Sequence, residues 1–90
     1  MQVVTAHEVP AWDLWVDFHR VDAAGLTHAN VRHATAGMRF EEGQFIVVRD
    51  DDADPAVAQV IELGREGLVL LRILPGHADL HRQLLQPRPA

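Results

Sequence analysis

The stretch AVAQVIELGREGLVLLRIL, residues 56–74, determines the fold more than any other part of the chain. Two runs rich in Val, Ile and Leu flank the sequence GREG at 64–67. A glycine-bounded turn between two such runs favours a β-hairpin. We therefore predict strands at 56–63 and 68–74.

This predicted hairpin is apolar on both faces. Side chains alternate between the two faces of a strand, so the register decides which residues meet. The expected register pairs Leu63 with Leu68, Ile61 with Leu70, and Val60 with Leu71. A chain of this size has one interior, so something outside that interior must cover the second face. The two candidates are a C-terminal helix and a second copy of the chain.

A second hairpin is predicted over residues 12–34. Apolar and polar residues alternate over 12–21, a turn with acidic residue and glycine follows at 22–25, and 26–34 reads as the returning strand. A four-residue loop is preferred to a three-residue loop because it pairs apolar residues with one another on the inner face. The expected inner pairs are Val16–Val31 and Phe18–Ala29, and the expected outer pairs are Trp15–Arg32, Asp17–Asn30 and His19–His28.

The rest of the chain predicts one more strand and one short helix. A short segment at 38–40 leads into a strand at 44–49, and the acidic, proline-containing sequence 50–55 is expected to form a loop. The leucines of 78–85 are spaced by one helical turn, which predicts a short helix that depends on docking. The predicted organisation is an N-terminal segment at 1–11, a β-barrel domain at 12–75, the short helix within 76–85 and a tail at 86–90.

Length and composition exclude several classes of function. The chain has 90 residues, enough for one domain with a modest core. Its formal net charge of -5 disfavours binding to nucleic acid. It contains no cysteine, which excludes disulfides and thiolate metal sites. No apolar run reaches the ~20 residues of a membrane span, and the first ten residues do not read as a signal peptide, so we expect a cytoplasmic protein with no membrane partner.

One part of the sequence resembles a known group of folds. Residues 40–48, FEEGQFIVV, are followed by an acidic turn at 50–52 and by AQVIE at 58–62. This succession resembles the middle strands of SH3-like barrels, the group that includes Tudor and KOW modules. The resemblance implies a mainly β, five-stranded antiparallel barrel that binds other molecules and performs no chemistry. The chain departs from the group's pattern in having no tyrosine and in lacking the basic surface of KOW-type RNA binding.

Trp15 is the most prominent candidate for binding. The alternating pattern places its ring on the outer face, flanked by Asp13 and Asp17 and opposite Arg32. A large aromatic ring left in water is costly, so either Arg32 and the chain termini cover it or a partner does. A peptide that carries arginine or lysine would suit this surface, and so would a second copy of the chain.

Six histidines raise a metal-binding alternative, because imidazole is a common ligand of zinc, copper and nickel. His19 and His28 are expected to face each other across the first hairpin. His77 and His81 are expected on one face of the helix. Neither pair has an evident third ligand in the sequence.

The acidic residues Asp50, Asp52 and Asp54 have the spacing that opens a calcium-binding loop. The rest of that motif is missing, since Pro55 stands where the loop needs glycine and Ile61 stands where it needs glutamate. We therefore predict a solvated hairpin loop here and no calcium site.

Catalysis has little chemistry to draw on, because the chain has no serine, cysteine or tyrosine. A nucleophile would have to be Thr5, Thr27, Thr35 or a carboxylate. Asp17 could orient His19 for general acid–base chemistry, but residues two apart on a strand are neighbours in almost any β-protein. We predict no catalytic residue.

The sequence leads to one predicted function and two alternatives. The prediction is a non-catalytic protein-interaction or assembly module, without a cofactor, that binds a protein or peptide and forms a homodimer through 56–74. The first alternative is a small metal-binding protein or enzyme that uses the histidines His19, His28, His77 and His81. The second is a small regulatory protein of the antitoxin type.

Overall fold

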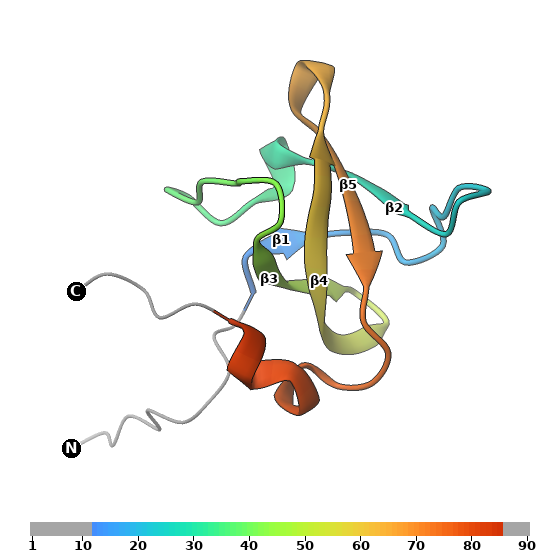
Figure 1. The fold of residues 1–90 in the computed structure, drawn as a ribbon, viewed down its shortest axis with the longest axis vertical. Coiled ribbons are helices and arrows are strands. Elements are labelled where there is room, and N and C mark those ends of the chain that lie inside the picture. The colour runs from blue at the N-terminus through green and yellow to red at the C-terminus, as the bar shows by residue number, and fades with distance from the viewer. Residues whose placement is uncertain (1–11, 86–90) are drawn as a thin grey trace.

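The computed structural model describes residues 12–85, and these residues form a mainly β structure, as predicted (Figure 1). The strands are β1 (Leu14–Trp15), β2 (Thr27–Asn30), β3 (Phe45–Asp50), β4 (Ala53–Leu63) and β5 (Leu68–Ile73). Three 3-10 helices accompany them: η1 (Val31–His33), η2 (Arg65–Gly67) and η3 (Ala78–Leu84). The segments predicted at 1–11, with Thr5, and at 86–90 lie outside the described residues. No helix within 12–85 is long and apolar enough to cross a membrane.

The five strands form one mixed sheet that curls into a half-barrel (Figure 1). Their order is β1-β3-β4-β5-β2. β3, β4 and β5 are antiparallel neighbours, and β2 joins the other edge of β5, also antiparallel. β1 lies parallel to β3, because the long chain between them returns to the sheet in the direction in which it left. The prediction of an entirely antiparallel barrel is therefore wrong.

The hairpin predicted at 56–74 is formed by β4 and β5. Val60 pairs with Leu71 as expected. A β-bulge at Ile61 then shifts the register by one residue, because a bulge places two residues of one strand opposite one of its partner. Beyond the bulge the observed pairs are Glu62–Leu70 and Leu63–Val69, in place of the predicted Ile61–Leu70 and Leu63–Leu68.

The loop predicted at 50–55 is shorter than expected. Asp50 ends β3 and pairs with Ala53, which leaves a tight turn between β3 and β4. Pro55 lies inside β4, next to the irregularity in the β3–β4 pairing, where a residue without a backbone N–H is tolerated. The acidic segment is therefore a hairpin turn, as predicted, with its proline in the strand.

The hairpin predicted at 12–34 does not form. β1 pairs with β3 and β2 pairs with β5, so the two segments meet only through isolated bridges, Leu14–Ala34 and Val21–Thr27. Both bridges follow the three-residue-loop register that the apolar pattern disfavoured. Hydrogen bonds of Asp22 fix this register. Its carboxylate accepts the backbone N–H groups of Ala24 and Leu26, and its own N–H donates to the Leu26 carbonyl at 2.9 Å. This side-chain contribution to the turn is invisible to a count of apolar residues.

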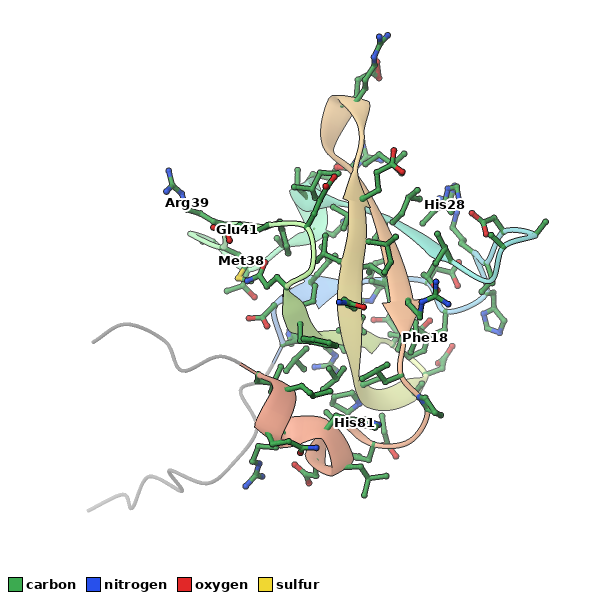
Figure 2. The ribbon with its side chains drawn as sticks, viewed as in Figure 1. Phe18, His28, Met38, Arg39, Glu41 and His81 are labelled. Atoms are coloured by element: carbon green, nitrogen blue, oxygen red, sulfur yellow. The ribbon has the colours of Figure 1, made fainter. Side chains whose placement is uncertain are left out.

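The core lies on the concave face of the half-barrel. Strands β1, β3, β4 and β5 and the residue that follows β1 supply its buried side chains, which are Leu14, Val16, Ile46, Val48, Ala56, Ala58, Val60, Val69 and Leu71. Phe18, Met38 and Phe40 come from the connecting segments and pack against this cluster while remaining partly exposed. Figure 2 labels Phe18 and Met38 among the side chains around the sheet.

The opposite face of the sheet is covered in one region by η3. Val47 and Val57 pair with each other and alternate with the core residues, so they point away from the core, yet both are fully buried. η3 packs against β4, and its first residue, Ala78, is also fully buried. The C-terminal segment, one of the two candidates named from the sequence, therefore covers part of the second apolar face.

η3 differs from the helix predicted at 78–85. It is a 3-10 helix interrupted by non-helical geometry at His81, so His77 and His81 do not share an α-helical face. His77 caps the helix by accepting the backbone N–H of Asp79, and the ring Nε2 of His81 lies 2.7 Å from the Pro75 carbonyl. The side chain expected to dock, Leu80, is 66% exposed. Docking through Ala78 instead shows why the leucine spacing was misleading: a segment of this length takes its conformation from its contacts.

Candidate functional site

The Trp15 ring is partly covered by its own chain. Its Nε1 donates to Asp51 Oδ1 at 2.9 Å, and its ring lies edge-on to the ring of His33 with the centroids 5.6 Å apart. The one-residue change of register explains this neighbour, because it brings His33 opposite Trp15 in place of Arg32. Arg32, the predicted neighbour of Trp15, instead donates from Nε to His33 Nε2 at 3.4 Å. Neither Asp51 nor His33 was predicted to contact Trp15.

Asp13 has a structural role. It is 4% exposed and exchanges two hydrogen bonds with Val47: its backbone N–H donates to the Val47 carbonyl at 2.8 Å, and its Oδ2 accepts the Val47 N–H at 2.9 Å. The carboxylate thus continues the β1–β3 pairing by one residue. It is not directed at the solvent, so the predicted flank of the Trp15 site is absent on this side.

Asp17 and His19 meet Asp50 at the end of β3. One ligand atom from each of the three side chains lies within 4.8 Å of the others. His19 Nδ1 is 3.3 Å from Asp17 Oδ1, and the His19 side chain is 90% exposed. Asp50 is 7% exposed. Asp50, which was predicted to lie in a separate loop, thus joins the Asp17–His19 pair as a third group.

Backbone hydrogen bonds fix Asp50 at this position. Its Oδ1 accepts the N–H of Asp52 and its Oδ2 accepts the N–H of Phe18, each at 3.0 Å. These two hydrogen bonds, first that from Asp52 and then that from Phe18, hold the pKa of Asp50 below its ordinary value, against the opposing effect of burial. The carboxylate is therefore ionised at neutral pH. Its place at the end of an apolar strand, with two more aspartates after it, is the sequence signal that could have located it.

His28 is not part of this cluster. Its backbone N–H donates to the Arg20 carbonyl, and its Nε2 lies 2.9 Å from Asp22 Oδ2. The predicted pairing of His19 with His28 is therefore wrong. The hydrogen bond from His28, together with those from Leu26 and Ala24, lowers the pKa of Asp22.

The two threonines within the described residues do not resemble nucleophiles. Thr27 is 1% exposed, inside β2. Thr35 donates its hydroxyl to the Trp12 carbonyl at 2.8 Å. The chemistry gathered at the end of β3 consists of carboxylates, imidazole and indole, which suits binding of a cation or a polar partner.

Comparison with known proteins gives no further guide to this site. No family model matches the sequence, and neither a curated protein nor a solved structure shows significant similarity to it. The assignment of function therefore depends on the geometry of the chain itself.

Proposed function

We propose that the chain is a non-catalytic interaction and assembly module that forms a homodimer. The observation that carries this proposal is a pair of partly exposed leucines on the outer sheet face. Leu68 and Leu70 alternate along β5 with the core residues Val69 and Leu71, so they point outward, and both are only partly buried. η3 packs against β4, whereas Leu68 and Leu70 on β5 remain partly exposed.

The surroundings of Leu70 favour a second copy of the chain as the partner. Glu62 is paired with Leu70 across the sheet, and Arg72 lies two residues further along the same face. Both side chains are exposed, and no ion pair of either is found within residues 12–85. A twofold axis near Leu70 would bring Glu62 of each copy toward Arg72 of the other. This arrangement is self-complementary, which is what an isologous interface requires.

The remaining parts of the proposal follow from the sequence. We place the half-barrel among the SH3-like folds because short strands curl around one core and because of the resemblance of residues 40–62 to that group. We propose Trp15, Asp17 and Arg32 as the surface for a protein or peptide partner. Such a partner would have to displace His33 or Asp51 to reach the indole. The net charge of -5 argues against nucleic acid as that partner, and the expected location is the cytoplasm.

Light scattering coupled to size-exclusion chromatography tests the homodimer. We expect about 20 kDa for the wild type, twice the 10.0 kDa of one chain. Leu70→Asp should give a folded monomer, because it puts a charge at the centre of the interface. Leu80→Asp is the matched control, since it puts the same charge on an apolar residue that is exposed on η3, and it should remain dimeric.

A charge exchange tests the pairing itself. Glu62→Arg and Arg72→Glu should each weaken the dimer about tenfold or more, because each places like charges opposite one another, and the double variant should regain most of the affinity. A mass of about 10 kDa for the wild type at millimolar concentration would overturn the proposal. Equal behaviour of the single and double variants would overturn the twofold arrangement around Leu70.

A further inference from the structure

We propose that Asp17, His19 and Asp50 bind a divalent transition-metal ion. The three side chains come from the segment after β1 and from the end of β3, which are more than thirty positions apart in the sequence. They offer two carboxylate oxygens and one imidazole nitrogen. Within residues 12–85 this is the one group of three such side chains close enough to share an ion.

The spacing requires only a small movement to fit a metal. Ligand bonds of about 2.0–2.2 Å place two atoms bound to the same ion about 3.0–3.5 Å apart. The His19 and Asp17 atoms are already 3.3 Å apart, and the widest separation in the group is at most 4.8 Å. The His19 side chain is 90% exposed, so its ring can adjust its position toward the two carboxylates without moving the sheet.

The two carboxylates are positioned by the backbone. The N–H of Phe18, which stands between Asp17 and His19, donates to Asp50 Oδ2. The N–H of His19 donates to Asp17 Oδ1 at 2.9 Å. These bonds attach residues 17–19 to the end of β3, so that little conformational freedom is lost when an ion binds. Each carboxylate oxygen that accepts one N–H keeps a second lone pair for a metal.

The donor set selects the class of ion. Imidazole nitrogen is a good ligand for zinc, cobalt, nickel and copper and a poor one for calcium and magnesium, which take oxygen ligands. Three protein ligands leave at least one coordination position for water or for a donor from another molecule. With a neutral imidazole the group carries two negative charges, which a divalent cation neutralises.

The chain supplies a matched control for this site. Asp22 and His28 form another aspartate–histidine pair, with Nε2 and Oδ2 2.9 Å apart, and none of the residues 12–85 brings a third ligand within reach of it. His28→Ala and His19→Ala therefore remove the same side chain from two similar pairs, only one of which belongs to the proposed site. His19→Ala is the better test variant than any change at Asp50, because the exposed ring can be removed without taking hydrogen bonds from the backbone.

Calorimetric titration of the full chain with Zn²⁺ tests the site. We expect one equivalent to bind the wild type, with affinity reduced at least about tenfold in His19→Ala and in Asp17→Asn and unchanged in His28→Ala. A wild type that shows no saturable binding overturns the proposal. So does equal affinity of the wild type and His19→Ala, because the ion would then bind elsewhere in the chain.

A second measurement locates the ion without relying on variants. Paramagnetic Co²⁺ should broaden the NMR signals of residues 17–19 and of Asp50 at substoichiometric concentration, before those of His28 and His81. Broadening centred on another histidine overturns the proposal. The site lies at the end of β3 and the proposed dimer face lies on β5, so a failure of metal binding and a failure of dimerisation are separately observable.

Discussion

Replacing Asp13 by alanine will show whether this carboxylate is a structural acceptor or a group free to bind a partner. Its Oδ2 accepts the N–H of Val47 at 2.9 Å in a buried position. Alanine removes a hydrogen bond to a charged group, worth about 1.5–3 kcal/mol, and leaves a buried donor without this acceptor, which costs about 1–3 kcal/mol. Because the two estimates overlap, we expect a loss of about 2–4 kcal/mol in the free energy of unfolding. Small domains have only about 5–15 kcal/mol in total.

Urea unfolding followed by circular dichroism measures this loss. With a slope of about 1–2 kcal/mol per molar urea, the midpoint should fall by about 1–4 M. Asp13→Asn is the control, because it keeps an acceptor oxygen in a side chain of the same size, and it should cost roughly 1 kcal/mol. An alanine variant within about 0.5 kcal/mol of the wild type would refute the structural role, since surface substitutions stay within that range.

Two further predictions concern the turns. Gly67→Ala should be more destabilising than Gly25→Ala. Both glycines have φ near +82°, a conformation that costs alanine about 1–2 kcal/mol. A Cβ at Gly67 would also lie 2.8 Å from the Val31 side chain, whereas the space around Gly25 is open. Thermal unfolding of both variants gives the comparison, and equal losses would contradict it. Asp22, whose pKa is lowered chiefly by its hydrogen bond with His28, stabilises the fold above its unfolded pKa, and this contribution is lost as pH falls through the lower folded pKa. Asp22→Asn should therefore be less stable than the wild type at pH 7 and lose less stability on acidification, as measured by urea midpoints from pH 7 to 3.

The elements that could be predicted are those whose pattern is local. The apolar runs and glycine turn of 56–74 specify the β4–β5 hairpin, and the run that ends at Arg49 predicts β3 to within one residue. The pairing of β1 with β3 and of β2 with β5 could not be read in this way. Such contacts join segments far apart in sequence, and a strand's own pattern shows which face is buried without showing which neighbour it takes.

The candidate site was predictable only in part, for a related reason. Asp17 and His19 were identified from their spacing, but their relation to Asp50 depends on the parallel pairing of β1. The same pairing directs Asp13 to Val47 and away from solvent. The Asp22 hydrogen bonds set a register one residue away from the predicted one. This shift places His33 beside Trp15, where Arg32 was predicted. Side-chain hydrogen bonds in a turn can thus decide which functional groups meet on the strands that follow.

The parallel contact of β1 has a consequence for solubility. Two residues of β1, supported by the bonds of Asp13 to Val47 and of the Val16 N–H to the Arg49 carbonyl, occupy the outer edge of β3. Without them, the apolar sequence of β3 would present an unpaired strand edge to other molecules. Such edges are templates for intermolecular sheet growth. Opening of this short contact would expose that edge while the β3–β4–β5 meander stays folded, so the fraction of molecules with β1 detached would govern the rate of aggregation.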